Sequence, residues 1–265
     1  MRRSWTASAT ILQNGLNRVA LFPPVNTRIR INKFFTQHGI CSRREADRLI
    51  ESGRVTINGR AAKLGDLVAA GDVIARDGQV IPWGSETIYI KYHKPIGVTT
   101  TSESHVARNI IAAIGHPERI FPIGRLDKDS SGLILLTNDG DIVNEILRTE
   151  FGHEREYHVS VNRPFDQAFL DRMAQGVVIL GSRTKPCQVE RLGPTRFRII
   201  LTEGRNRQIR RMCQALGYRV LTLHRVRIMH ITIAGLPPDT WKDLTDEERT
   251  KLLQKVERGA AVRDR

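Results

Sequence analysis

The sequence is organised around one stretch, Ile123-Gly124-Arg125-Leu126-Asp127-Lys128-Asp129-Ser130-Ser131-Gly132-Leu133-Ile134-Leu135-Leu136. Its polar first half carries Arg125 and Asp127, and its apolar end, Leu133 to Leu136, is typical of a buried strand. A carboxylate between a turn and a buried strand is held still, as a reacting group must be. Asp is also common in loops as a turn or capping residue. The stretch alone therefore leaves Asp127 either a turn residue or a catalytic one.

The composition indicates a soluble globular protein with a polyanionic partner. The 265 residues are 40% hydrophobic and 26% charged, which suits one large domain and a small one. Lys and Arg number 42 against 28 Asp and Glu, and the net charge of +14 favours nucleic acid over an anionic membrane surface. No window reaches the ~18 apolar residues that span a bilayer. The three cysteines show neither zinc-site spacing nor a disulfide pattern, which favours a reducing cytosol.

Residues 1–26 contain three arginines and no acidic residue. A transit peptide, an over-long start and a disordered basic leader all have this composition. The segment has no clear amphipathic stripe and ends at Pro23-Pro24, which favours a disordered leader.

Residues 28–72 are predicted to form a compact module of two helices and a hairpin. Ser42-Arg43-Arg44-Glu45 is a capping box at the start of the second helix, and Asn58-Gly59 is a tight hairpin turn. Eight basic and three acidic residues lie between Arg28 and Arg60. Most charge runs are solvated helix faces, but this excess in a small module makes contact with a phosphate backbone equally reasonable. The candidate RNA-binding residues are Arg28, Lys33, Arg43, Arg44, Arg48 and Arg54.

The remainder of the chain is predicted to be a linker, a larger domain and a short tail. Gly78, Pro82 and Gly84 indicate a linker over residues 73–86. Alternating and helically spaced apolar residues then indicate strands and helices over residues 87–257, with a closing helix at 245–257. Residues 258–265 are expected to be frayed.

Two further motifs in the larger domain combine polar and aromatic residues. Glu154-Arg155-Glu156-Tyr157 opens a strand whose alternation makes Tyr157, taken alone, a core tyrosine. Glu203 to Cys213 contains a glycine turn and then a helix with four arginines within seven positions. Asp139 and Asp141 have a spacing that could suit Mg²⁺, but no phosphate-cradling loop is near, so turn and cap roles are favoured. The eight histidines lack metal-ligand spacing.

An acid among so many arginines should stay ionised, because nearby positive charge favours the carboxylate. A positioned, ionised carboxylate is a competent nucleophile. Arg125, two residues from Asp127, has the shape and charge either to fill a gap in a base stack or to hold a phosphate.

Two resemblances draw these motifs together. The run from Ile31-Asn32-Lys33 to Asn58-Gly59 resembles an S4 RNA-binding domain. Gly124-Arg125-Leu126-Asp127, followed by Glu154 to Tyr157 and Gly204 to Met212, is similar to the three motifs of the RsuA/RluA-type pseudouridine synthases. The S4 domain indicates the RsuA branch, and the residues around Arg207 and Arg227 are most similar to a member that acts on large-subunit ribosomal RNA. The implied fold is α+β: a small S4-like domain plus a catalytic domain on a mixed, mainly antiparallel β-sheet.

The resemblance implies conversion of uridine to pseudouridine without cofactor or metal. The enzyme breaks the N-glycosidic bond, turns the uracil and rejoins it through carbon 5. Asp127 attacks the flipped-out nucleotide or promotes a glycal-forming elimination, and the sequence leaves both routes open. Tyr157 stacks on the base and relays a proton, and Arg210 pairs with the aspartate. The substrate-binding residues implied are Arg125, Leu126, Ile209, Arg207 and Gln208.

We therefore expect a cytoplasmic monomer that modifies ribosomal RNA, most reasonably 23S, without binding a membrane. Small-subunit ribosomal RNA or transfer RNA stays open as the target. A non-catalytic S4-type RNA-binding or ribosome-assembly protein is the main alternative, yet degenerate versions should have lost Asp127 or Tyr157. A different carboxylate enzyme, such as a hydrolase, would usually need a second acid or a metal, and only Asp129 is near.

Overall fold

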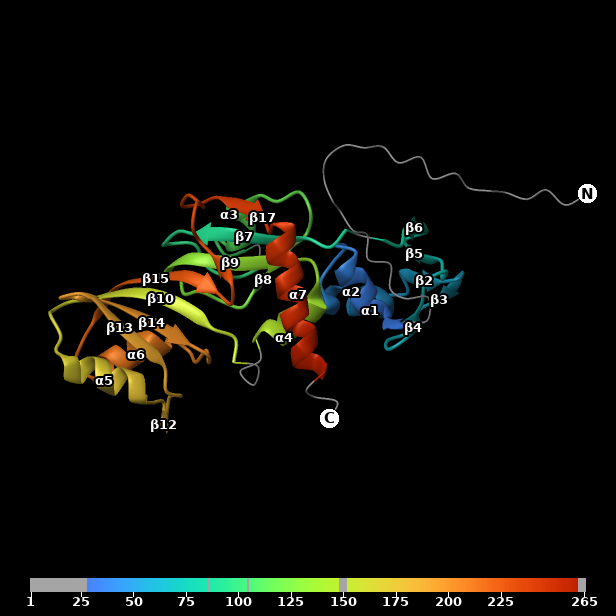
Figure 1. The fold of residues 1–265 in the computed structure, drawn as a ribbon. Helices are drawn as coiled ribbons and strands as arrows, with labels where there is room; N and C mark the ends of the chain where they lie inside the picture. The colour runs from blue at the N-terminus through green and yellow to red at the C-terminus, as the bar shows by residue number, and fades with distance from the viewer. Residues whose placement is uncertain (1–27, 85, 104, 148–151, 262–265) are drawn as a thin grey trace, which may run out of the picture.

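The computed structural model describes residues 28–84, 86–103, 105–147 and 152–261, and these residues form two domains (Figure 1). The predicted leader over residues 1–26 lies outside them. No helix in the described part of the chain is both long and apolar enough to cross a bilayer.

The N-terminal domain packs two short helices against small sheets. Its elements are β1 (Ile29–Arg30), α1 (Ile31–Gln37), α2 (Arg43–Glu51), β2 (Val55–Ile57), β3 (Arg60–Ala61), β4 (Leu67–Val68), β5 (Ile74–Arg76) and β6 (Gln79–Ile81). The capping box is present, because the Ser42 hydroxyl accepts a hydrogen bond of 3.2 Å from the Glu45 amide. Asn58 and Gly59 both have positive φ, as a tight hairpin between β2 and β3 requires.

The segment predicted as a linker, residues 73–86, belongs in large part to this domain. β5 and β6 extend the β2–β3 hairpin into a sheet of order β3-β2-β5-β6. Ile74 is fully buried, and Asp77 and Gly78 have positive φ at the turn between the two strands. Gly78 therefore lies in a tight hairpin turn, and residues 74–81 belong to the sheet of the N-terminal domain. The linker prediction was wrong for these residues.

The C-terminal domain, which the resemblance predicts to be the catalytic domain, is built on one large sheet. Its elements are β7 (Tyr89–Lys94), α3 (Ile110–Ile114), β8 (Phe121–Ile123), β9 (Ser131–Thr137), α4 (Gly140–Leu147), β10 (Arg155–Val161), α5 (Gln167–Gln175), β11 (Val178–Ile179), β12 (Ser182–Arg183), β13 (Gln188–Gly193), β14 (Arg196–Leu201), α6 (Gln208–Ala215), β15 (Val220–Ile228), β16 (Ile231–Thr232), β17 (Trp241–Asp243) and α7 (Asp246–Ala261). α7 runs four residues beyond the predicted 245–257, so residues 258–261 are helical and not frayed. Residues 262–265 lie outside the described chain.

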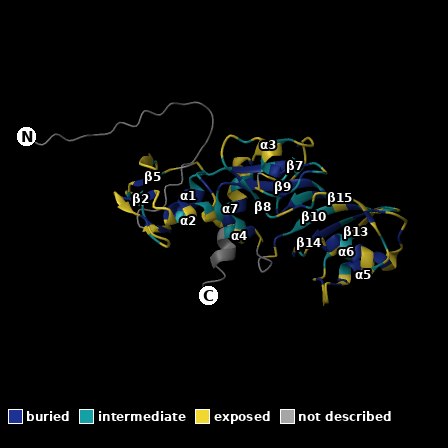
Figure 2. Ribbon diagram, turned by 180° about the vertical axis from the view of Figure 1, so that it is seen from behind, coloured by how far each residue is buried: buried dark blue, intermediate teal, exposed yellow. Residues whose placement is uncertain are grey.

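Among the described residues the large sheet has nine strands in the order β13-β14-β10-β15-β9-β7-β17, with β8 on β9 and β16 on β15. Named strands in it pair antiparallel except for β9 and β15, which run parallel through Ser131–His224 and Gly132–Arg225. This confirms the mixed, mainly antiparallel sheet. The neighbouring strands β7 and β9 are largely buried (Figure 2).

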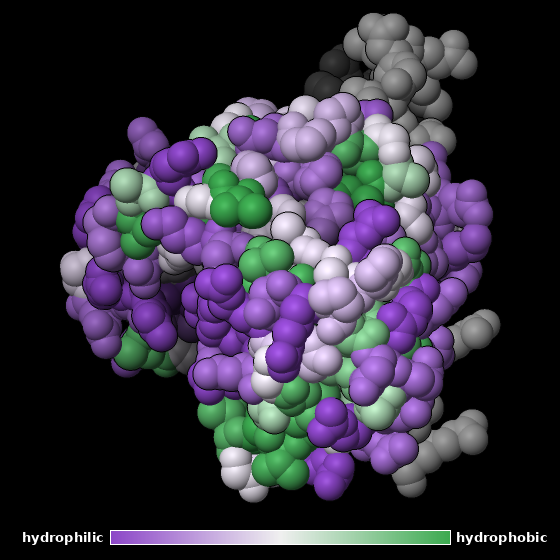
Figure 3. All heavy atoms as spheres, turned by 90° about the vertical axis from the view of Figure 1, so that its left-hand side faces the viewer, coloured by the Kyte–Doolittle hydropathy of each residue, from purple (hydrophilic) through white to green (hydrophobic). Residues whose placement is uncertain are grey.

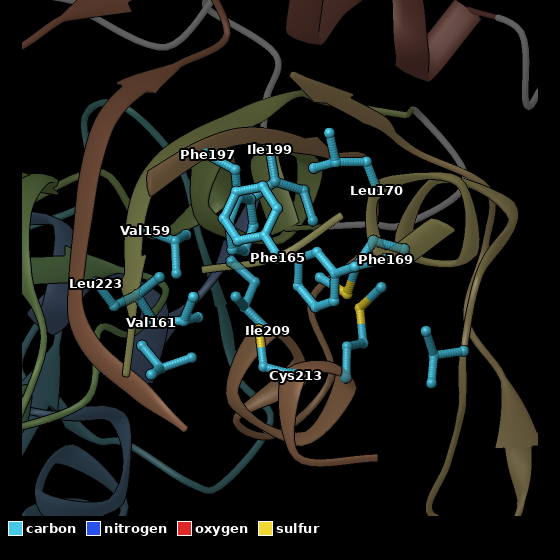
Figure 4. Close-up of a cluster of buried hydrophobic side chains, with 14 of the residues drawn as sticks. Val159, Val161, Phe165, Phe169, Leu170, Phe197, Ile199, Ile209, Cys213 and Leu223 are labelled. Atoms are coloured by element: carbon cyan, nitrogen blue, oxygen red, sulfur yellow. The ribbon is translucent and has the colours of Figure 1, made fainter. Parts of the chain in front are cut away.

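One hydrophobic core fills the space between this sheet and the helices α5 and α6. Ile209 and Cys213 of α6 and Phe169 of α5 point toward sheet residues such as Val159 and Phe197 (Figure 4). A separate hydrophobic core lies between strands β8 and β9 of the sheet and the helices α4 and α7. The loop that carries Asp127 leads into β9, whose Leu133 and Leu135 belong to this core. Ile134 and Leu136, on the other face of β9, belong to a further core with β7 and α3, so packing on both faces fixes where β9 begins.

Candidate active site

A pocket of about 440 Å³ opens beside the predicted catalytic loop. It is bounded by the loop before β9, by β10 and β15, and by the turn before α6. The residues at its wall include every catalytic-domain candidate from the sequence except Arg210. Those candidates are Arg125, Leu126, Asp127, Tyr157, Arg207, Gln208 and Ile209. The fold therefore brings together three motifs that are far apart in the chain.

The backbone of the Asp127 loop is held at each residue from Arg125 to Asp129. All five carbonyl oxygens accept hydrogen bonds: Arg125 from Arg225 Nη1 (3.4 Å), Leu126 from Thr100 Oγ1 (2.7 Å), Asp127 from Ser130 N (3.1 Å), Lys128 from Gly97 N (2.8 Å) and Asp129 from Arg210 Nη2 (2.8 Å). A loop fixed in this way presents its carboxylate without reorganising. Asp127 is consequently a preorganised group at the pocket wall and not only a turn residue.

Arg207 faces the carboxylates of the loop. Its Nη1 lies 3.5 Å from Asp127 Oδ2, and its two terminal nitrogens donate to Asp129 at 3.1 and 3.0 Å. These hydrogen bonds hold the pKa of Asp129 below its ordinary value. Arg207 has a φ of 51°, a left-handed conformation that is uncommon for a side-chain-bearing residue and is tolerated at functional sites. This conformation at the start of α6 accompanies the long-range contact from Arg207 to the loop.

Arg210 supports the loop from a different side. Its Nη2 donates to the Asp129 carbonyl at 2.8 Å and to the Ser130 hydroxyl at 3.2 Å. The expected ion pair between Arg210 and Asp127 is not found in the described structure, because the guanidinium of Arg210 contacts the Asp129 carbonyl, the Ser130 hydroxyl and, at 3.5 Å, the Asp129 carboxylate. The ion pair with Asp127 is made by Arg207 instead.

Tyr157 and Ile209 supply the apolar part of the pocket. Tyr157 is half-buried on β10, between Ile199 of β14 and Arg225 of β15, and its ring packs against the α5–α6 core. Ile209 and Leu126 are buried residues of the pocket wall. An aromatic ring and apolar side chains that line one pocket are suited to hold an unstacked base.

Gln208 has its amide committed within the protein. Its Nε2 donates to Glu203 Oε1 at 2.8 Å, and its Oε1 accepts from the Arg205 amide at 3.0 Å. These contacts close the turn that carries Arg207. The side chain predicted to bind substrate therefore makes structural contacts that hold the turn.

The sequence reasoning missed two arginines at the pocket, of which Arg225 is buried and Arg155 is half-buried. Arg225 is 3% exposed, and its Nε donates to the Leu133 carbonyl at 2.7 Å. Arg155 donates to the Ile146 carbonyl at 3.2 Å, and burial lowers the pKa of its guanidinium. The alternation of β15 was a usable signal, because Arg225 stands two positions after the buried Leu223 on this strand.

The candidate RNA-binding residues of the N-terminal domain fall into two groups. Three have charged partners: Lys33 with Asp141 of α4 (2.7 Å), Arg48 with Glu45 (3.1 Å) and Arg54 with Asp77 (2.6 Å). Arg28, Arg43 and Arg44 are exposed, and none makes an ion pair within the described residues. The Lys33 contact lies where α1 meets α4, so this lysine joins the two domains (Figure 1).

The Asp139 and Asp141 pair has structural partners. Asp139 accepts from the Tyr89 hydroxyl at 2.7 Å and from the Asp141 amide at 3.0 Å. Asp141 stands in the first turn of α4 and faces Lys33. These contacts agree with turn and cap roles.

Comparison with known proteins identifies both domains. Residues 29–74 match the S4 domain family, and residues 88–215 match the RNA pseudouridylate synthase family. The chain is 49% identical over 234 residues to the dual-specificity RNA pseudouridine synthase RluF of Salmonella typhi, covering 88% of this chain and 81% of that protein. It is 31% identical over 239 residues to the ribosomal large subunit pseudouridine synthase B of Bacillus subtilis, covering 87% and 98%.

A solved structure supports the same assignment. The crystal structure of a pseudouridylate synthase superimposes with a TM-score of 0.62 at 29% identity, over 84% of this chain and 99% of that one. Family, sequence and fold agree with a pocket whose wall carries both a fixed aspartate and an aromatic ring. The chain therefore belongs to the RNA pseudouridylate synthase family and carries an S4 domain before its catalytic domain.

Proposed function

We propose that this pseudouridine synthase modifies a uridine of large-subunit ribosomal RNA, with Asp127 as the reacting carboxylate. The observation that carries the proposal is the fixed Asp127 loop, whose five carbonyl oxygens are all bonded. The name of the Bacillus subtilis relative supports the choice of RNA. The proposal also takes the enzyme as a cytoplasmic monomer that works without a cofactor or metal.

In the proposed reaction the uridine leaves the helix and enters the pocket. Unstacking costs a few kcal/mol, and Arg125, which is exposed at the pocket edge, fills the vacated space. Tyr157 lies against the base. The positively charged walls favour the phosphates on either side of the flipped nucleotide.

Asp127 then acts at the ribose. In one route its carboxylate attacks carbon 1′, and the bonding pair of the glycosidic bond leaves with the uracil as an anion. In the other it removes a ribose proton, and a glycal forms as the uracil leaves. In both routes the uracil rotates and carbon 5 bonds to carbon 1′. In the first route this bond displaces the Asp127 carboxylate, and in the second the protonated Asp127 returns its proton to the ribose carbon from which it was taken. The carbon 5 proton is then lost to restore the aromatic ring. Tyr157 is the proposed relay for that proton.

We infer that a second class of RNA is also a substrate. The relatives from Salmonella typhi and Escherichia coli strain K12, at 49% and 47% identity, are named dual-specificity RNA pseudouridine synthases. Transfer RNA is the candidate for this second activity. Arg43 and Arg44 of the S4 domain are exposed beside the catalytic domain and suit a phosphate backbone of either RNA.

The decisive experiment is to map pseudouridines in ribosomal and transfer RNA from a strain that lacks the gene. A uridine in 23S RNA that loses its modification, and regains it with the wild-type gene but not with Asp127→Asn, is the expected result. An unchanged 23S pattern with a loss elsewhere would overturn the choice of RNA but not the activity. Restoration by Asp127→Asn would overturn the role of the aspartate.

A further inference from the structure

The turn after β7 holds an apolar side chain out beside the active site. Ile96 is 59% exposed, although it stands between the buried residues Lys94 and Val98. Exposed apolar residues scattered over a surface need no explanation, but this one projects next to the catalytic loop. The face of the molecule seen in Figure 3 is largely hydrophilic, with separate apolar patches.

The Ile96 turn is rigid. The buried Lys94 donates from Nζ to the Pro95 carbonyl at 2.9 Å and to the Val98 carbonyl at 2.8 Å. Gly97 donates from its amide to the Lys128 carbonyl at 2.8 Å. The turn is thus attached both to the interior and to the catalytic loop. Ile96 is presented in a fixed position and cannot easily fold away from water.

A hollow of about 560 Å³ lies between this turn and the catalytic loop. Arg125, Leu126, Asp127 and Arg207 line both this hollow and the uridine pocket, so the two cavities share a wall. A molecule in the hollow would therefore be a direct neighbour of a uridine in the pocket. In an RNA substrate, the direct neighbour is the adjacent nucleotide of the same strand.

The charges around the hollow suit a nucleotide. Arg125 and Lys128 are exposed at its wall, and the guanidinium of Arg108 lies against the turn, 3.9 Å from the position of a Cβ on Gly97. Arg108 makes no ion pair within the described residues. The two acids of the wall, Asp127 and Asp129, face Arg207. An apolar surface rimmed by unpaired cations matches an unstacked base with its phosphate.

We propose that this hollow binds the nucleotide next to the target uridine, with its base against Ile96 and a phosphate at Arg108 and Lys128. The inference rests on the proposed RNA substrate and deepens it. When the uridine leaves the stack, Arg125 fills the vacated space against one flanking base, and Ile96 supplies an apolar contact for the base of the neighbour in the hollow. The hollow then contributes to the choice of target through the neighbouring base.

The first test is kinetic and uses total RNA from the deletion strain, which contains the unmodified target whatever its class. Ile96→Ala should lower kcat/KM by about fivefold, and Ile96→Phe should restore it, because the contact is apolar stacking. The matched control is Leu192→Ala, which alters a 41% exposed apolar side chain on β13, at the other edge of the sheet. Equal rates for Ile96→Ala and Leu192→Ala, at unchanged thermal stability, would overturn the proposal.

The second test maps the contact directly. p-Benzoyl-phenylalanine is placed at position 96 in an Asp127→Asn background, irradiated with the same RNA, and the crosslink is located by reverse transcription. We expect a stop at the nucleotide adjacent to the uridine that the wild-type enzyme modifies. A crosslink elsewhere, or none to RNA, would overturn the inference even where the target uridine is confirmed. If the target uridine lies in transfer RNA, the proposed ribosomal target is wrong, but the position of the crosslink still tests the inference about Ile96.

A third measurement separates the charge contribution. Arg108→Gln should reduce the slope of log affinity against log salt concentration by about 0.7, the value for one phosphate on a single strand. An unchanged slope would remove Arg108 from the site.

Discussion

Gly132 of β9 and Arg225 of β15 lie in direct backbone contact at the parallel pair of the large sheet. A Cβ added to Gly132 would come within 2.2 Å of the Arg225 carbonyl oxygen. Gly132 also has a φ of 116°, which few other residues adopt. The close approach matters because the Asp127 loop ends where this pairing begins. The close approach therefore sets the distance between the Asp127 loop and β15, the strand that carries the buried Arg225.

Gly132→Ala should therefore damage both stability and activity. We expect the free energy of unfolding to fall by about 2–3 kcal/mol, since the added methyl group must displace backbone. Denaturant unfolding and pseudouridine yield measure the two effects. Gly181→Ala is the control: Gly181 has a φ of 79°, but a Cβ there meets nothing within 4 Å. An equal loss for both variants would show that backbone conformation alone, and not the contact, is responsible.

Asp127→Asn should abolish pseudouridine formation and leave RNA binding unchanged, because the amide keeps the shape but not the reactivity. Asp129→Asn is the matched comparison two residues away. It weakens the hydrogen bonds from Arg207 at 3.1 and 3.0 Å and should lower kcat by about tenfold. Tritium release from 5-labelled uridine measures both rates. Substantial turnover by Asp127→Asn would refute the assignment.

Arg225→Gln should loosen the catalytic loop. It removes the hydrogen bonds to the Leu133 and Arg125 carbonyls, at 2.7 and 3.4 Å, in a buried site. We expect a loss of about 2–3 kcal/mol in the free energy of unfolding and faster amide hydrogen exchange over residues 125–130. Arg219→Gln, at an exposed position just before the same strand, should change stability by less than about 0.5 kcal/mol. Unaltered exchange in the loop would contradict the positioning role.

Lys94 predicts a pH dependence of stability. Burial and the nearby Arg225 charge lower its pKa to about 8 from an ordinary 10.5. Between these values the unfolded chain holds the proton and the folded protein does not, so the free energy of unfolding rises with pH. The gain is at most about 1.4 kcal/mol per pH unit. Relative to Lys94→Met, the wild type should become more stable in guanidinium chloride from pH 8 to 9.5, and a constant difference would contradict this.

Replacing Arg43 and Arg44 together by Gln should weaken RNA binding and flatten its salt dependence. Both guanidinium groups are exposed and are free of ion pairs within the described chain, so they are available to phosphates. Arg54→Gln is the control, because Arg54 already makes a bidentate contact with Asp77 at 2.7 and 2.6 Å. Binding titrations at several salt concentrations measure the slopes. A larger effect from Arg54→Gln would reverse the assignment of the RNA-binding surface.

Local features of the fold could be predicted because their causes lie within a few residues. The Ser42–Glu45 capping box, the Asn58-Gly59 hairpin and the buried strand at Leu133–Leu136 all form as predicted. The segment over residues 73–86 was misjudged for the converse reason. Its strand β5 pairs with β2, some twenty residues earlier in the chain, and a local pattern does not show such a distant partner. The pairing of β6 with β5 is local, and the Asp77-Gly78 turn was a usable signal for it.

The sequence by itself determined the three motifs and the residue types that the reaction needs, because motif spacing records chemistry directly. The sequence could not show which acceptor each arginine contacts. Only the tertiary structure decided that Arg207 meets Asp127 and Asp129, that Arg210 and Arg225 hold the loop backbone, and that Lys33 joins the two domains. All of these side chains are long cations, and which acceptor each one meets depends on contacts between segments far apart in the chain.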